Sequence, residues 1–160
     1  MDLRACLDEL DLEVPAPLWT PHPEQTTFSW VRAVGRRVLV SGHGPVRANG
    51  LPAAPFGRVP DQVTLERAQE GARLAAASVI ADVERAVGDL DRIEAWVTVT
   101  GYVQTEPGFP GLTTVLDAFS EVVLAVFGPA VGAHARTAVG VTALPLNLPL
   151  VVAAELSLAG

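Results

Sequence analysis

The apolar and polar positions of this chain follow two periods, one typical of strands and one typical of helices. Residues 93–104 alternate between apolar and polar side chains, as expected for a strand with one face in a core. Residues 65–86 and 112–127 carry apolar side chains three and four positions apart, which predicts two amphipathic helices. The many alanines of the first helix indicate that it packs closely on a sheet.

Local signals predict where these helices begin and end. Thr64 is suited to cap the first helix, and Gly88 is a natural stop after it. Gly128, followed by a proline, closes the second helix. A shorter amphipathic helix over residues 2–10 continues into an extended, proline-rich arm, and together they occupy residues 1–26.

Alternating stretches elsewhere predict four more strands, at residues 26–34, 37–42, 136–143 and 150–158. The first two form a hairpin that turns at Gly35 and Arg36. The loop at residues 48–60 can hold one further short strand near Val59. The order of these elements predicts a single α+β domain over residues 1–160, with a mixed sheet and both long helices on one face of it.

The two faces of the strand at residues 93–104 differ in chemistry. One face is apolar and should lie under the helices, whereas the other is polar and aromatic, which suits a subunit contact better than water. The predicted core face consists of Ile93, Ala95, Val97, Val99 and Val103. The predicted interface face consists of Glu94, Trp96, Thr98, Thr100, Tyr102 and Gln104.

Composition excludes some partners. The chain has 160 residues, 49% of them hydrophobic, which is enough for one core, and a net charge of −7. An acidic chain without a basic stripe is not typical of proteins that bind nucleic acid. The apolar runs are broken before they reach the length of a membrane span, and the N-terminus lacks a signal pattern. We therefore expect a cytoplasmic protein with neither nucleic acid nor membrane as partner.

One cysteine and three histidines offer little chemistry of their own. Cys6 can form no internal disulfide, and His22, His43 and His134 have no metal-ligand spacing. We interpret the arm around His22 as a surface crossing and His43 as a loop residue. We predict no metal site and no cofactor, and the chain has no glycine-rich phosphate loop.

Arg136 begins a strand whose other residues are apolar or small. It shares a strand face with Ala138, Gly140 and Thr142, so its guanidinium would lie beside open space rather than under packed side chains. Burying such a charge is costly unless an anion pairs with it, and a ligand carboxylate would serve. Alternatively, Arg136 extends to water and pairs with a surface carboxylate.

Several segments, in this order and spacing, make the chain resemble the Rid (YjgF-like) family. They are the Ser41–Pro45 turn, the helix around Ala72, the Gly88–Ile93 turn, and the run His134–Val141 followed by Leu144 and Pro145. The likeness extends from about Phe28 to Leu156. It is greatest to the branch with a short N-terminal helix.

The resemblance implies a chorismate-mutase-like fold and a homotrimer with pockets between adjacent subunits. It also implies hydrolysis of reactive enamines and imines to 2-oxo acids and ammonia. Arg136 would hold the substrate carboxylate, aided by the backbone next to it at Thr137 and Ala138. Ser41 would line the pocket as a catalytic residue, with Gly42 and Leu116 beside the substrate. From its spacing alone, the Ser41 hydroxyl is equally well explained as the cap of a turn.

Three positions depart from the deaminating branch of the family. Its tyrosine, asparagine and glutamate are replaced here by Phe28, Asp117 and Val151. The carboxylate pocket should persist while most of the acid–base groups are missing. Asp117 is a candidate catalytic residue near the pocket, and its alternative is a solvated position on its helix. Glu155 points the same way as Val151 but lies about 13 Å along the strand, too far to replace the missing acid.

Three functions remain open. The first is a Rid-type deaminase whose activity is weak or altered because Val151 replaces the catalytic glutamate. The second is a divergent member that binds a small carboxylate metabolite or acts in a biosynthetic pathway. The third is a trimeric ligand-binding protein without turnover.

Overall fold

The computed structural model describes residues 1–20 and 26–160, so the part of the predicted arm around His22 lies outside the described residues. The helices are α1 (Leu3–Asp8), α2 (Leu65–Val87) and α3 (Leu112–Gly132). The strands are β1 (Val31–Val34), β2 (Arg37–His43), β3 (Ile93–Gln104), β4 (Ala135–Val141) and β5 (Leu150–Leu158). Two short 3-10 helices, η2 (Leu90–Arg92) and η3 (Pro145–Asn147), lie in connections.

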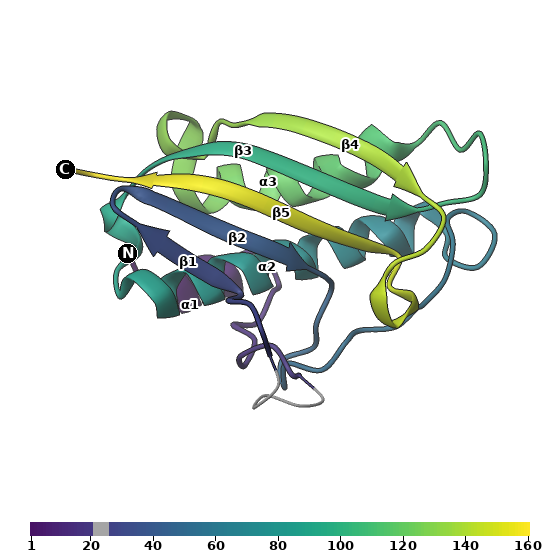
Figure 1. Cartoon of the computed structure of the whole chain (residues 1–160), viewed down its shortest axis with the longest axis horizontal. Coiled ribbons are helices and arrows are strands. Elements are labelled where there is room, and N and C mark those ends of the chain that lie inside the picture. The colour runs from purple at the N-terminus through teal and green to yellow at the C-terminus, as the bar shows by residue number, and fades with distance from the viewer. Residues whose placement is uncertain (21–25) are drawn as a thin grey trace.

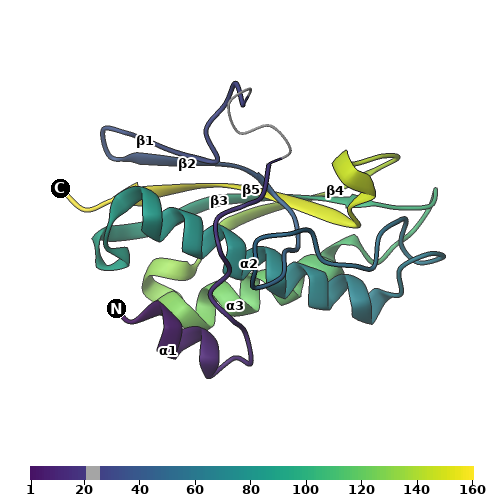
Figure 2. The same ribbon diagram turned by 90° about the horizontal axis from the view of Figure 1, so that it is seen from below.

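The strands form one mixed sheet in the order β1-β2-β5-β3-β4 (Figure 1). β3 and β4 are parallel, and the other neighbouring strands are antiparallel. Both long helices cover the same face of the sheet, and the described part of the chain places no helix of this length on the opposite face (Figure 2). The buried hydrophobic side chains form one core between the sheet and these helices. This is the α+β architecture that the sequence predicted.

α2 begins and ends as its sequence predicts. The Thr64 hydroxyl accepts a hydrogen bond from the backbone N–H of Arg67 at 3.3 Å, and Gly88 takes the left-handed conformation with a φ of 82°. Ala72 and Ala75 are fully buried, so the small side chains let the helix backbone approach its neighbours closely. Local capping chemistry therefore sets both ends of this helix.

α3 is longer than predicted. Gly128, with a φ of 70° and a ψ of 170°, interrupts the helix where the prediction ended it, but another helical turn follows. Contrary to the expectation that apolar runs are too short, α3 has the length and hydropathy of a membrane span. Half of that stretch is buried inside the fold, where α3 packs against α2 and β3. α3 is thus the core helix of this domain.

Two of the predicted strands are shorter in the structure. β1 begins at Val31 instead of residue 26. The short strand expected near Val59 is reduced to a single parallel bridge between Val59 and Thr105. Residues 26–30 therefore precede the strand instead of forming part of it.

Irregular pairing of β3 with β5 overturns part of the predicted faces of β3. The register shifts near Ala95 and again between Trp96 and Thr98, and each shift interrupts the alternation of side chains. Trp96 is therefore buried against Phe119 of α3, whereas Val97 is 42% exposed. The predictions of Trp96 at an interface and of Val97 in the core were both wrong. Thr98, Thr100 and Tyr102 remain on the open face.

Candidate functional site

A bulge in β2 determines which of its side chains reach the open face. The register with β5 shifts between Val40 and His43, so that Ser41 and Gly42 lie opposite a single residue of β5. Both residues line a cavity, and the next one, His43, returns to the core. The sequence predicted a loop position for His43, but it is the last residue of β2 and fully buried.

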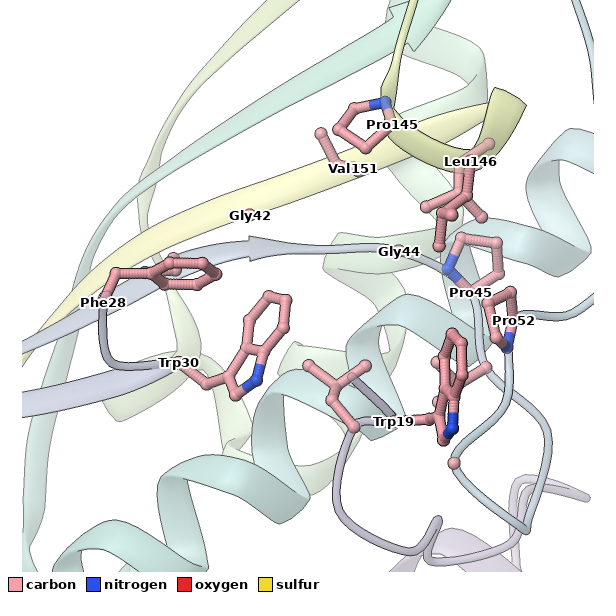
Figure 3. Close-up of a pocket in the computed structure, with 15 residues that line it drawn as sticks. Trp19, Phe28, Trp30, Gly42, Gly44, Pro45, Pro52, Pro145, Leu146 and Val151 are labelled. Atoms are coloured by element: carbon pink, nitrogen blue, oxygen red, sulfur yellow. The ribbon is translucent and has the colours of Figure 1, made fainter. Parts of the chain in front are cut away.

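The cavity at the end of β2 has a volume of about 440 Å³ (Figure 3). Phe28 and Trp30 line it on one side, Trp19 of the N-terminal arm on another, and Leu146 of η3 and Val151 of β5 lie across from them. None of the 15 lining residues carries an ionisable side chain. This space can hold an apolar group, but the described residues around it offer no acid or base for catalysis.

The arm that carries Trp19 is fixed to the loop after β2. The backbone N–H of Ala16 donates to the carbonyl of Ala48 at 2.8 Å, and that of Trp19 donates to the carbonyl of Gly50 at 3.1 Å. Gly50 has a φ of 79°, and any side chain there would collide with the carbonyl oxygen of Pro17. The Trp19 wall is thus set by backbone hydrogen bonds that require a glycine.

A buried network supports the cavity from beneath. His43 donates from Nδ1 to the carbonyl of Ser41 at 2.6 Å, and its Nε2 lies 3.2 Å from Asp82 Oδ2. The His43 ring also meets the Trp30 ring edge-on, with centroids 5.5 Å apart. Arg85 donates to Asp82 and to the carbonyl of Pro15 in the arm. Two cavity walls, Trp30 and the arm, are therefore tied to one buried carboxylate.

The charge of Asp82 is stabilised in the folded protein. Burial acts to raise the pKa of Asp82, but the hydrogen bonds from His43 and Arg85 and their charges act in the opposite direction and prevail. The pKa of Asp82 therefore lies below its ordinary value. Asp82 is ionised at neutral pH and holds both partners in place.

The wall across from the aromatic residues is the η3 turn, which Gln104 holds. Its Nε2 donates to Asn147 Oδ1 at 2.8 Å, and its Oε1 accepts from the backbone N–H of Leu144 at 3.1 Å. Leu146 and Asn147 both have left-handed φ values, 57° and 56°, which are uncommon for residues other than glycine. Gln104, predicted on the face of a subunit interface, is instead buried within its own chain, only 4% exposed, and keeps this strained turn in shape.

Arg136 lies elsewhere, on the edge strand β4, with its side chain toward α3. Its Nη2 donates to Asp117 Oδ1 at 2.7 Å, and its Nη1 donates to Ser120 Oγ at 2.9 Å. The guanidinium is thus paired with a carboxylate of its own chain, the alternative that the sequence left open. Asp117 is half exposed, and the two bonds use only two of the five guanidinium N–H groups.

Ser120 and His134 complete this cluster, and the sequence analysis did not single them out as partners. The carbonyl of Gly132 accepts a hydrogen bond from His134 Nδ1 at 2.7 Å, so Nε2 is free to accept from the Ser120 hydroxyl at 2.9 Å. The signal was present in the spacing, because Asp117 and Ser120 are three residues apart and share a face of α3.

The predicted site residues therefore separate into two groups within one chain. Phe28, Ser41, Gly42 and Val151 line the cavity on the open side of the sheet. Arg136 and Asp117 pair on the helix side, at the β4 edge. β5 and β3 lie between β2 and β4, so the two groups are three strand spacings apart, roughly 14 Å. A small ligand cannot contact both groups in the same chain.

The remaining predicted site residues do not line the cavity. Thr137 is exposed, and Ala138 packs against the edge of the core. Leu116 is fully buried, and it lies so close to Gly101 that any side chain there would collide with it. The structure thus places Leu116 in the core rather than in a wall of the cavity.

The nearest carboxylate along β5 is engaged elsewhere. Arg37 donates two hydrogen bonds to Glu155, at 2.7 and 3.1 Å, and these bonds hold the pKa of Glu155 below its usual value. Glu155 pairs across the sheet with Thr98, whereas Val151 pairs with Tyr102. Within residues 1–20 and 26–160, no three His, Cys, Asp or Glu side chains converge as a metal site.

Comparison with known proteins identifies the class. No family model matches the chain. It is 33% identical to Protein TCP17 of Trypanosoma cruzi over 156 residues, which are 98% of this chain and 94% of that protein. It resembles Atu1372 of Agrobacterium tumefaciens, a protein of unknown function, with a TM-score of 0.85 and 28% identity over 98% of this chain and 91% of that one.

The fold extends the comparison to a named family. The E. coli YjgF gene product superposes with a TM-score of 0.62 and 18% identity, over 90% of this chain and 96% of that one. At this identity the likeness concerns the fold, which is the chorismate-mutase-like fold of YjgF proteins. The chain therefore has the YjgF-like (Rid) fold, and its 33% identity shows that it belongs to the same family as Protein TCP17.

Proposed function

We propose that this protein is a Rid-type imine or enamine deaminase of low turnover, which binds a small carboxylate between the subunits of a homotrimer. The observation that carries the proposal is the separation of Arg136 from the Ser41 cavity. A ligand whose carboxylate contacts Arg136 and whose other end enters the cavity must bridge two chains. In a cyclic trimer, the β4 edge of one subunit would lie beside the open sheet face of the next.

Arg136 is suited to hold a carboxylate at such an interface. Ser120 accepts a hydrogen bond from its guanidinium and helps to fix its plane, and a planar fork binds a carboxylate through two parallel hydrogen bonds. Asp117 is half exposed and can turn toward water when a ligand carboxylate takes its place. In the protein without ligand, the Asp117 carboxylate therefore occupies the position beside Arg136 that the ligand carboxylate would take.

Low turnover follows from the proton-transfer groups that are present. Imine hydrolysis adds water across the C=N bond and expels ammonia, so a nearby group must take a proton from water and deliver one to nitrogen. Within the two groups of residues, Asp117 and His134 are able to do so, and both lie on the Arg136 side. Val151 and the other cavity residues contribute only shape.

A second function, binding of a small carboxylate metabolite without turnover, is favoured by one observation. Among residues 1–20 and 26–160, no ionisable side chain lines the cavity, and the hydroxyl of Ser41 already donates to the carbonyl of Ser29 at 2.7 Å. A cavity without a free acid or base is adequate for binding and poor for hydrolysis.

Ammonia release from freshly generated 2-aminoacrylate tests the proposal. Wild type should release ammonia slowly, and Arg136→Ala and Gly42→Leu should each abolish release, the first by removing the cation and the second by filling the cavity. Mixing equal amounts of the two inactive variants should restore about a quarter of the wild-type pockets. A pocket is intact only when one subunit supplies Arg136 and its neighbour supplies Gly42.

The possible results separate the two functions. If subunits exchange but mixing restores nothing, the pocket does not lie between chains and the proposal fails. If wild type releases no ammonia while calorimetry shows binding of 2-oxobutanoate that depends on Arg136, the second function holds instead.

A further inference from the structure

The cavity exposes aromatic side chains that a soluble protein normally covers. Trp19 is 48% exposed and Phe28 is 54% exposed, although both are large and apolar, and Leu146 across from them is 57% exposed. Figure 3 shows these side chains arranged around the same space. Its volume of about 440 Å³ lies within the range of small-molecule sites.

The aromatic walls are preformed rather than loose. The backbone N–H of Ser41 donates to the carbonyl of Trp30 at 2.9 Å, and the Trp30 ring is held edge-on by His43. Phe28 meets Trp30 edge-to-face, with ring centroids 4.9 Å apart at an angle of 79°. Aromatic walls fixed in this way favour a flat ring, which can meet them by offset stacking or edge contacts.

Arg32 lies next to this cavity. Arg32 pairs with Leu39 across the β1–β2 hairpin, and with Phe28 and Ser41 it lines a second hollow that shares these two residues with the aromatic cavity. Arg32 makes no hydrogen bond or ion pair with residues 1–20 or 26–160. Arg37 of β2, by contrast, forms an ion pair with Glu155.

We infer that this combined site binds a small aromatic carboxylic acid, with its ring between Trp19 and Trp30 and its carboxylate at Arg32. The inference rests on the cavity of the proposed function and adds acids with a planar aromatic group to the ligands that this cavity can take. It differs from that proposal in taking the cation from the same chain, so the site does not need a second subunit.

A matched set of three compounds tests the inference: phenylpropanoate with ring and acid, phenylpropanol with the ring alone, and propanoate with the acid alone. Binding is followed by tryptophan fluorescence and calorimetry, since Trp19 and Trp30 line the site and Trp96 is buried in the core. We expect phenylpropanoate to bind three- to tenfold more tightly than phenylpropanol, and propanoate not to bind the cavity detectably.

Variants then assign each half of the ligand. Arg32→Gln should weaken phenylpropanoate roughly three- to tenfold and leave phenylpropanol unchanged, because the partner of Arg32 is the carboxylate. Trp19→Ala should weaken both ring-bearing compounds by about tenfold. Arg47→Gln, at another exposed arginine, is the matched control and should change neither.

The inference and the proposed function fail in different ways. Phenylpropanoate binding that is absent at millimolar concentration, no tighter than that of phenylpropanol, or unchanged in Arg32→Gln overturns the inference. Loss of phenylpropanoate binding in Arg136→Ala but not in Arg32→Gln also overturns it, while supporting the site between subunits. A monomer that binds phenylpropanoate through Arg32 and releases no ammonia from 2-aminoacrylate supports the inference and defeats the proposed function.

Discussion

The β4 edge and the β2 cavity are opposites in chemistry. At the edge, Asp117, Arg136, Ser120 and His134 form one continuous chain of hydrogen bonds. In the cavity, the walls are apolar and the hydroxyl of Ser41 is engaged by a backbone carbonyl. The edge provides charged side chains, whereas the cavity provides an apolar volume whose 15 lining residues are uncharged. An anionic ligand with an apolar part therefore needs both regions, or a cation nearer the cavity.

The two regions also differ in how they are supported. The Arg136 pair lies at a sheet edge, and its carboxylate is half exposed, so solvent screens it. The cavity rests on Asp82, whose side chain is only 10% exposed and which joins β2, α2 and the arm. Substitutions at the edge should therefore change ligand affinity, whereas substitutions beneath the cavity should change the free energy of unfolding.

The largest expected effect is on trimer assembly. Without the trimer, the β4 edge of one subunit could not meet the β2 cavity of the next, and the proposed pocket between them would be lost. Thr98 is exposed on the open face of β3, and Thr98→Arg would bury an unpaired charge in a subunit contact, at a cost of about 3–5 kcal/mol. Sedimentation velocity should show a trimer for wild type and a folded monomer for this variant.

Its matched control is Thr113→Arg, at an exposed position of α3, which should remain a trimer. Ammonia release should disappear in Thr98→Arg while phenylpropanoate binding within one chain persists. A wild type that is monomeric at micromolar concentration contradicts the trimer and the shared pocket together.

The second largest effect should come from removing the positive charge of Arg136 at the β4 edge. Arg136→Ala should weaken binding of 2-oxobutanoate by on the order of 2–4 kcal/mol, because a bidentate charge-assisted pair is lost. Arg136→Lys should be nearly as weak, since a point charge lacks the planar fork. Isothermal titration measures both, with Arg37→Ala as the control arginine, and unchanged binding in folded Arg136→Ala would refute the role of Arg136.

Weakening the support of the cavity should lower stability rather than binding chemistry. Asp82→Asn leaves His43 and Arg85 facing a neutral group, which should reduce the free energy of unfolding by about 2–3 kcal/mol at pH 7. Because the folded-state pKa of Asp82 is lowered, this stabilisation is present above the unfolded-state pKa of about 4. It is lost as the pH falls below that value through the folded-state pKa.

Urea unfolding of wild type and Asp82→Asn between pH 7 and pH 3 measures this prediction. The free energies of unfolding of the two proteins should differ most at neutral pH and become equal in acid. Asp61→Asn, at an exposed position, serves as the control. A difference that is independent of pH would show that shape, rather than the charge of Asp82, supports the cavity.

The smallest expected effect comes from giving the cavity the acid it lacks. Val151→Glu should raise 2-aminoacrylate hydrolysis by roughly 10–100-fold, since well-positioned acid–base groups contribute roughly 10²–10⁴-fold. Ala153→Glu, two residues along the same strand face, is the control and should gain much less. A wild type that is already fast, with no gain in Val151→Glu, would indicate that Asp117, His134 or ordered water carries the proton.

Only part of the candidate site was predictable from sequence. Ser41, Gly42, Phe28 and Val151 were assigned to one pocket, and the structure brings these four together. The sequence placed Arg136 in the same pocket, but within one chain it lies across the sheet from them. Trp19, Trp30 and Arg32 were not recognised, because what makes them neighbours is the path of the arm and the hairpin rather than any spacing in the sequence.

The sequence by itself determined the elements and their order. The ends of α2 at Thr64 and Gly88 follow from capping chemistry, and the helices follow from apolar spacing, both of which act within a few residues. Only the tertiary structure decided that His43 and Trp96 face the core and that Arg136 pairs with Asp117. A bulge depends on how two strands fit together, and an ion pair depends on which helix covers a strand. Alternation along one strand carries no information about either.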